Sequence, residues 1–142
     1  MVTASVVARM LGGSDRRPPR GTDMGLVGAV RDGLPIAALD RLISDGVISE
    51  AEIETRFIPR RTLYARRQKG VLSREQSDFL VRLARIQAMA DEVFDDRSKS
   101  YGWLRDRNGA LGGERPLDLL DTEEGGRVVE ATLGRIAHGI VE

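Results

Sequence analysis

The chain has 142 residues, with 22 Lys and Arg balanced by 22 Asp and Glu, and it contains no cysteine. This length allows one domain or two very small ones, and the lack of cysteine excludes disulfides and thiolate metal sites. Aromatic residues make up only 4% of the sequence, which argues against a large β-sandwich. No apolar run approaches the roughly 18–20 residues of a membrane span, and no secretory signal is recognisable, so a cytoplasmic location is expected.

Charge is unevenly distributed along the chain. Residues 1–70 contain 12 Lys and Arg and 8 Asp and Glu, a balance of +4, whereas residues 71–142 contain 10 and 14, a balance of −4. This asymmetry fits a basic first half that meets a polyanion and an acidic second half that meets another partner. Random scatter in a neutral protein produces differences of this size as well, so both interpretations stay open.

The first 22 residues are predicted to form a flexible tail. Residues 12–22 read GGSDRRPPRGT, which is rich in Gly, Pro and Arg and has no periodic apolar positions. From Met24 a short apolar stripe predicts a helix up to Gly33. Pro35 then begins a second amphipathic helix, which ends at Gly46.

Two short helices joined by a tight turn follow. Ser49 and Glu52 form a capping-box motif that opens a helix to about Phe57, and Pro59 begins another helix that ends at Gly70. A turn of about three residues between two short helices is typical of a helix-turn-helix.

The second of these helices is strongly basic. Six cations lie between residues 56 and 69 with no acidic residue among them. Their mutual repulsion requires compensation from outside, and DNA phosphates are suited to it. Leu63 is predicted to point inward. The alternative interpretation of this helix is that its basic side chains are only solvated and bind no DNA. The predicted DNA-binding residues are Arg60, Arg61, Thr62, Tyr64, Arg66, Arg67, Gln68 and Lys69.

A long helix and a compact helical segment complete the chain. Ser73 and Gln76 form a second capping box, and apolar residues at a 3–4 spacing predict a helix over about 73–95. Ser98 is a candidate cap for a brief helix, and Thr122 begins a last helix with acidic residues in its first turn. The predicted buried face of the last helix comprises Val129, Leu133, Ile136 and Ile140.

No combination of residues typical of an enzyme is present. His138 is the only histidine, and a lone histidine rarely forms a catalytic or metal site, so a packing or interface role is expected. Adjacent carboxylates such as Asp91 and Glu92 do not face each other on a helix and are interpreted as solvated groups or caps. We therefore expect no catalytic residue, no metal and no cofactor.

Much of the sequence resembles a known family. Residues 62–86 are similar to the end of an Xre-type DNA-binding domain that runs into the long helix of RES–Xre antitoxins, and residues 101–140 resemble the toxin-binding domain of these antitoxins (Xre, MbcA and ParS). The resemblance covers about residues 25–140. The elements that carry it in the second half are Trp103-Leu104, Asn108, Ala110–Gly113, Pro116-Leu117, Leu120, Thr122, Gly125, Val129, Leu133, Ile136 and His138-Gly139.

The pattern and the resemblance together predict an all-α protein. Its expected parts are a tail over 1–22, an Xre-like helix-turn-helix domain over 23–72, a long linking helix over 73–96 and a toxin-binding domain over 97–142. The alternative is a stand-alone helix-turn-helix regulator whose C-terminal unit only dimerises.

The resemblance implies an antitoxin that covers the active site of a RES-domain toxin, an enzyme that consumes NAD⁺ or transfers ADP-ribose from it. It also implies repression of the operon through operator DNA, and a homodimer or a toxin–antitoxin hetero-oligomer with no membrane partner. The predicted toxin-binding residues are Arg135, His138, Gly139, Ile140, Val141 and Glu142.

Overall fold

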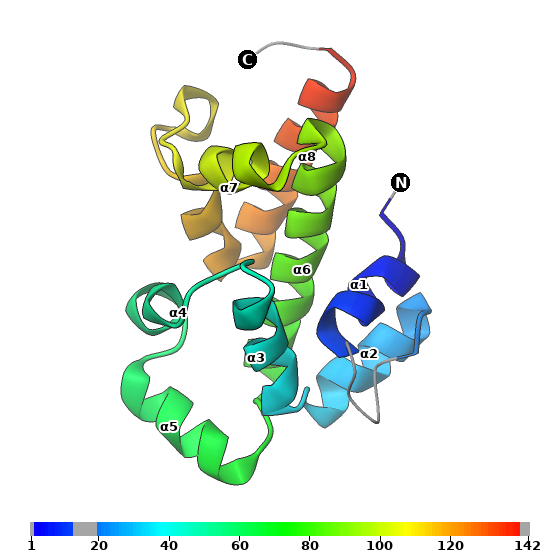
Figure 1. The fold of residues 1–142 in the computed structure, drawn as a ribbon, viewed down its shortest axis with the longest axis vertical. Coiled ribbons are helices and arrows are strands. Elements are labelled where there is room, and N and C mark those ends of the chain that lie inside the picture. The colour runs from blue at the N-terminus through cyan, green and yellow to red at the C-terminus, as the bar shows by residue number, and fades with distance from the viewer. Residues whose placement is uncertain (1, 13–19, 140–142) are drawn as a thin grey trace. The chain divides into compact units, whose positions relative to one another are not determined.

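The computed structural model describes residues 2–12 and 20–139. Within these ranges the chain forms eight α-helices and two short 3₁₀ helices, which is the all-α fold that the sequence predicts (Figure 1). The chain divides into an N-terminal unit, residues 3–84, and a C-terminal unit, residues 85–142 together with residues 1–2. The long helix α6 (Arg74–Phe94) contributes residues to both units. None of the described helices is long and apolar enough to cross a membrane.

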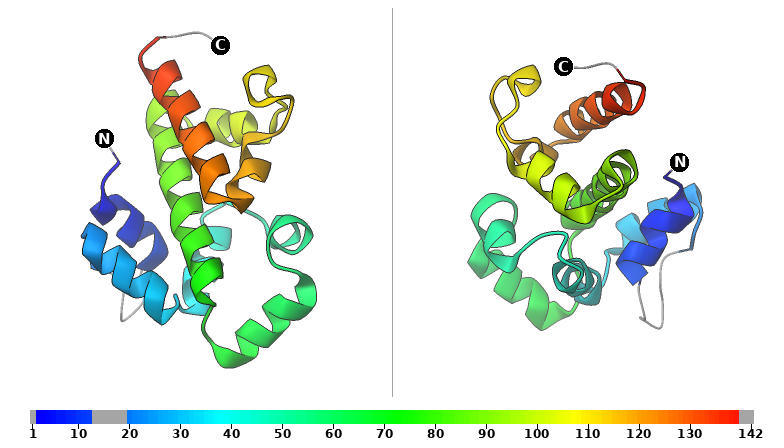
Figure 2. Two further views of the ribbon diagram at one scale, coloured as in Figure 1. Left: turned by 180° about the vertical axis from the view of Figure 1, so that it is seen from behind. Right: turned by 45° about the horizontal axis from the view of Figure 1, so that its top comes forward.

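The N-terminal unit begins with a helix that the sequence analysis missed. Helix α1 (Ala4–Gly12) buries Val7 and Leu11, packs against α3 (Ile36–Ser44) and lies beside α2 (Asp23–Asp32), as both views of Figure 2 show. The prediction of a flexible tail over residues 1–22 is therefore wrong for residues 4–12. Val7 and Leu11 have helical spacing, but a nine-residue segment is too short to be stable alone and needs tertiary packing.

The connection between α2 and α3 is held against the connection between α5 (Arg60–Lys69) and α6. Gly33 has a φ of +88°, and a Cβ there would lie 2.5 Å from the carbonyl oxygen of Leu72. Next to it, the Leu72 N–H donates to the carbonyl oxygen of Leu34 at 2.8 Å, and the Leu34 N–H donates to Ser77 Oγ at 2.7 Å. Only glycine combines this conformation with so close an approach.

The predicted helix-turn-helix is present. Helices α4 (Glu50–Arg56) and α5 (Arg60–Lys69) are separated by residues 57–59. The capping box at the start of α4 is complete, since the Ser49 N–H donates to Glu52 Oε1 at 3.0 Å and the Glu52 N–H donates to Ser49 Oγ at 3.1 Å. The ring of Phe57 stacks on Phe79 of α6, with 4.3 Å between the ring centroids.

The C-terminal unit surrounds a small apolar core. After α6 the chain forms α7 (Arg97–Arg105), η1 (Gly109–Leu111), η2 (Pro116–Asp121) and α8 (Glu123–Ala137). Asp96, not Ser98, caps α7. Trp103 contacts Phe94 of α6, with ring centroids 5.8 Å apart. The fully buried core side chains include Leu104, Leu117, Leu120, Val129 and Leu133.

Gly125 allows α8 to approach η2 closely. A Cβ on this residue would overlap the carbonyl oxygen of Leu119. Thr122 caps the helix, because its Oγ1 accepts the Gly125 N–H at 2.9 Å. On the buried face of α8, Val129 and Leu133 are buried as predicted, but Ile136 is only half-buried. Ile140, also predicted for this face, lies outside the described residues.

Candidate functional site

The outward face of α5 carries polar and cationic side chains. Arg61, Tyr64, Ala65, Gln68 and Lys69 are exposed. They recur at i, i+3, i+4, i+7 and i+8, which places them on one side of the helix, away from the buried Leu63. Cations and hydrogen-bonding groups on an exposed helix after a tight turn are suited to contacting the edges and phosphates of DNA. We call these five residues the α5 face.

Arg67 is not part of this face. Its Nη1 donates to Asp40 Oδ1 of α3 at 2.8 Å, and its Nη2 donates to Glu50 Oε1 of α4 at 2.6 Å. The hydrogen bond to Asp40 raises the pKa of Arg67 most strongly; burial opposes this, and Glu50 raises the pKa further. The guanidinium is thus compensated within the fold. The expectation that all six cations need an external counter-charge is therefore wrong for Arg67, whose contact with DNA stays a prediction.

The other predicted DNA-binding residues differ in accessibility. Arg60 is exposed and its Nε lies 4.0 Å from Glu54 Oε2, whereas Thr62 and Arg66 are half-buried. Ala65 was not singled out by the sequence analysis, although it follows Arg61 by one helical turn. Because its side chain is a single methyl group, it permits a close approach between α5 and a partner at the centre of the face.

The predicted toxin-binding residues lie at the end of α8. Arg135 is half-buried and His138 is exposed. His138 Nδ1 donates to the carbonyl oxygen of Gly134 at 2.7 Å, which holds the ring against the last turn. Gly139 has a φ of +78°, a left-handed conformation that ends the helix. The remaining predicted residues, Ile140, Val141 and Glu142, lie outside the described residues.

A hydrogen-bonded loop connects α7 to η2. Asn108 Oδ1 accepts the Ala110 N–H at 2.9 Å, and the Asn108 N–H donates to the carbonyl oxygen of Glu114 at 3.1 Å. Gly112 and Gly113 have φ values of +69° and +81°. The two consecutive left-handed conformations explain why both residues are glycine.

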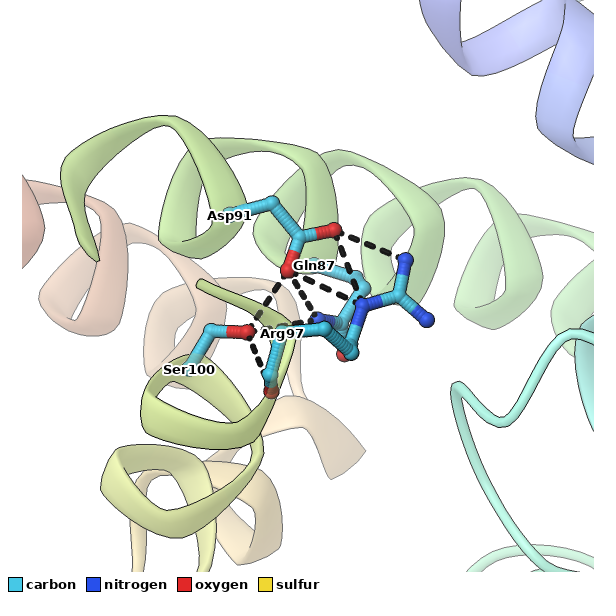
Figure 3. Close-up of polar contacts among 4 residues, drawn as sticks. All are labelled: Gln87, Asp91, Arg97 and Ser100. Carbon is cyan, nitrogen blue, oxygen red and sulfur yellow. Dashed lines mark hydrogen bonds and ion pairs between the residues drawn. The ribbon is translucent and has the colours of Figure 1, made fainter. Parts of the chain in front are cut away.

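Asp91 of α6 accepts hydrogen bonds from three side chains, two of which lie on α7 (Figure 3). Its carboxylate accepts hydrogen bonds from Arg97 Nη2 at 2.8 Å, from Ser100 Oγ at 2.6 Å and from Gln87 Nε2 at 2.9 Å. Gln87 and Ser100 are fully buried. The interpretation of Asp91 as a solvated carboxylate is therefore wrong. Its partners Arg97 and Ser100 lie beyond the end of α6, so the spacing on one helix does not reveal them.

The pKa of Asp91 lies below its ordinary value. Burial raises this pKa, but the hydrogen bonds from Arg97, Ser100 and Gln87, together with the charge of Arg97, outweigh the effect of burial. The carboxylate is therefore ionised at neutral pH and holds α7 in place. Nowhere in the described ranges do three His, Cys, Asp or Glu side chains come together in a way that could hold a metal ion.

Two apolar features on α8 were also missed by the sequence analysis. Val128 is exposed on the helix surface. A cavity of about 420 Å³ lies in the C-terminal unit, between α6 and α8. Its lining combines apolar residues with a charged rim: Val2, Arg85, Met89, Glu92, Val93, Glu130, Leu133, Gly134 and Ala137.

Comparison with known proteins matches both halves of the chain to antitoxin domains. The family model of the antitoxin Xre-like helix-turn-helix domain matches residues 25–85. The family model of the antitoxin Xre/MbcA/ParS C-terminal toxin-binding domain matches residues 89–139. The α5 face lies in the first match, and Asp91, Arg97, Ser100 and α8 lie in the second.

Similar proteins are also named antitoxins. An antitoxin Xre from Pseudomonas putida is 33% identical over 123 residues, which cover 86% of this chain and 77% of that protein. An antitoxin Xre from Photorhabdus laumondii is 30% identical over 115 residues, covering 79% and 78%. A Sphingobium protein named Prs ADP-ribosylating antitoxin is 35% identical over 77 residues, or 48% of each chain. With both domains present in this order, the chain belongs to the Xre family of antitoxins.

Proposed function

We propose that this chain neutralises a RES-domain toxin by covering the toxin's active site, and that it represses its own operon by binding operator DNA through α5. In this proposal the chain itself catalyses no reaction, needs no cofactor and acts in the cytoplasm. The observation that supports it best is the pairing, in one Xre antitoxin chain, of an exposed cationic α5 face with a toxin-binding domain.

DNA binding is proposed for the α5 face and for Arg60, which is exposed at the start of the same helix. Arg61 and Lys69 lie two turns apart on this face, so they are able to contact phosphates on either side of a groove that α5 enters. Tyr64 and Gln68 offer hydrogen-bonding groups between them. Thr62 and Arg66 are placed at the edge of the contact, whereas Arg67 is proposed to orient α5 and not to bind DNA.

The DNA proposal is tested by titrating the promoter region of the gene with the purified chain at several salt concentrations. In the double variant Arg61→Ala/Lys69→Ala, we expect weaker binding and a salt slope reduced by about 0.9 for each phosphate that the variant no longer neutralises. Arg127→Ala is the matched control, because Arg127 is also exposed but pairs with Glu123 and Glu124 of α8. An unchanged slope in the double variant would place the DNA surface elsewhere.

Toxin binding is proposed for the end of α8 and the residues that follow it, namely Arg135, His138, Gly139, Ile140, Val141 and Glu142. The structure supports this proposal by showing a well-packed unit behind that segment. The hydrogen bonds from Arg97 and Ser100 to Asp91 fix α7, Gly125 fixes the start of α8 on η2, and Gly139 ends the helix.

The toxin proposal is tested by co-expressing the chain with the protein encoded beside it, followed by pull-down and measurement of cellular NAD⁺. We expect the neighbour to be toxic alone and harmless with the chain. Removal of residues 138–142 should abolish protection but preserve DNA binding, whereas Arg127→Ala should affect neither. A fall in cellular NAD⁺ without any ADP-ribosylated protein indicates NAD⁺ consumption. A protein that carries ADP-ribose indicates ADP-ribosyl transfer. A harmless neighbour that does not co-purify would favour the stand-alone regulator.

A further inference from the structure

The cavity in the C-terminal unit has walls from two neighbouring helices. The last part of α6 and the whole of α8 run side by side in the same direction, as Figure 2 shows. On α6 the lining residues Arg85, Met89 and Val93 are one helical turn apart, so the cavity follows about 12 Å of this helix. Its volume of about 420 Å³ lies near the lower end of the roughly 300–1,000 Å³ of small-molecule pockets, which suits a small ligand.

The middle of the cavity is apolar. Met89 and Val93 line it from α6, and Leu133 and Ala137 line it from α8. Leu133 is fully buried, whereas Met89 and Val93 are only half-buried, so their side chains are open to the cavity. Such a lining favours an apolar group on a ligand, because binding removes the apolar surfaces of both molecules from water.

Gly134 keeps the α8 wall of the cavity open. A Cβ at this position would meet no other atom of the described chain within 4 Å, and the residue lies inside a regular helix. Neither the backbone conformation nor the packing therefore requires glycine here, although glycine weakens a helix relative to alanine. Because Gly134 lines the cavity, a large side chain at this position would occupy part of its volume.

Two side chains of opposite charge lie at one end of the cavity. Arg85 is half-buried on α6 and Glu130 is exposed on α8, and each precedes the apolar lining residues of its own helix. Because the two helices run in the same direction, both charges lie at the same end. Within the described ranges, neither side chain forms a hydrogen bond or an ion pair with another residue. Glu92, the third charged lining residue, lies two turns after Arg85 and belongs to the other end.

We propose that this cavity binds a free apolar α-amino acid of the size of leucine or methionine. The ligand carboxylate meets Arg85 and the ligand ammonium group meets Glu130. The ligand side chain lies between Met89 and Leu133. An α-amino acid carries both charges on one carbon atom with the apolar group beside them, which matches the order of charged and apolar residues along the cavity. A simple carboxylic acid would instead bring a second carboxylate against Glu130, and a simple amine would bring a second cation against Arg85.

The expected affinity is low. The charged end of the cavity is partly open to solvent, and the ligand has few apolar atoms to bury, so we expect a Kd on the order of 1 mM. The inference concerns the chain alone, without DNA or toxin, and it stands or falls separately from the proposed function.

Titration of the full chain with L-leucine, followed by methyl NMR spectroscopy, tests the site. We expect saturable shifts of the methyl signals of Met89, Val93 and Leu133. Three related compounds serve as probes of the recognition: N-acetyl-leucine lacks the ammonium group, leucinamide lacks the carboxylate, and glycine lacks the apolar side chain. Each should bind at least about tenfold more weakly than leucine.

Variants of the lining residues test the assignment of each contact. Gly134→Leu should abolish the shifts, whereas Ala131→Leu, at an exposed residue of the same helix that does not line the cavity, should leave them intact. Arg85→Gln should remove the preference for leucine over leucinamide, and Glu130→Gln the preference for leucine over N-acetyl-leucine. A change that only disturbed the fold would not separate these two preferences, and far-UV circular dichroism checks that the helices are retained.

Three results would overturn the proposal. The first is the absence of saturable shifts with both leucine and methionine. The second is binding of leucine that survives Gly134→Leu. The third is equal binding of leucine, leucinamide and N-acetyl-leucine, because the charged end of the cavity would then take no part in recognition.

Discussion

Substituting Arg67 by Met tests whether this residue orients α5 or contacts DNA directly. Methionine keeps an unbranched apolar stem of similar length but removes both hydrogen bonds, to Asp40 at 2.8 Å and to Glu50 at 2.6 Å. These two bonds tie α5 to α3 and α4. We expect the N-terminal unit to lose stability and α5 to lose its fixed orientation.

The expected loss is about 1–2 kcal/mol. A single ion pair between exposed side chains contributes about 0.2–1 kcal/mol, and the two carboxylates here are 52% and 54% exposed. The guanidinium is only 30% exposed and serves both carboxylates at once, so less side-chain entropy is lost per bond. The combined contribution of the two ion pairs therefore lies above that of an isolated surface pair and well below that of a buried pair.

Urea unfolding followed by far-UV circular dichroism measures this loss, with amide hydrogen exchange of α5 as a local probe. Tryptophan fluorescence is unsuitable, because Trp103 lies in the C-terminal unit. The difference between variant and wild type should shrink in about 1 M salt, which screens exposed charges. Arg61→Met is the control, since Arg61 is exposed on the α5 face; we expect weaker DNA binding with stability unchanged within about 0.5 kcal/mol.

The reasoning fails if Arg67→Met is as stable as the wild type at low salt. It fails also if a double-mutant cycle of Arg67→Met with Asp40→Asn shows no coupling between the two residues. If Arg67→Met reduces DNA binding but leaves stability and amide hydrogen exchange unchanged, Arg67 contacts DNA directly.

Three further predictions concern stability. Gly125→Ala should lower the free energy of unfolding by more than about 2 kcal/mol, because the new Cβ overlaps the carbonyl of Leu119. Gly134→Ala on the same helix, where a Cβ has open space, should raise the free energy of unfolding by up to about 1 kcal/mol. Equal melting temperatures of the two variants would contradict this prediction. Leu11→Ala should cost about 2–4 kcal/mol in thermal unfolding if α1 is part of the core, and almost nothing if it is a loose tail. The pKa of Asp91 is lower in the folded than in the unfolded chain, so its stabilisation is present above about pH 4 and is lost as the pH falls through the folded value; Asp91→Asn should remove that part of the acid-induced loss, and unfolding curves of equal pH dependence would refute it.

Local signals in the sequence were sufficient to predict most helices. The capping boxes at Ser49 and Ser73 are both formed, because a cap involves only neighbouring backbone and side-chain groups. The tight turn before Pro59 and the inward position of Leu63 follow from the apolar spacing in the same way. Helix α1 was missed because its stability depends on α3, which lies more than 20 residues away.

The sequence by itself determined the all-α class, the helix-turn-helix and the basic character of α5, since these depend on residues within one or two turns of each other. Only the tertiary structure decided which cations face outward. Arg67 meets Asp40 and Glu50 across 27 and 17 residues of chain, and Asp91 meets Ser100 across a helix junction. Such pairs form only after the helices have packed, because packing places the donor and the acceptor within hydrogen-bonding distance. No local spacing in the sequence encodes that distance.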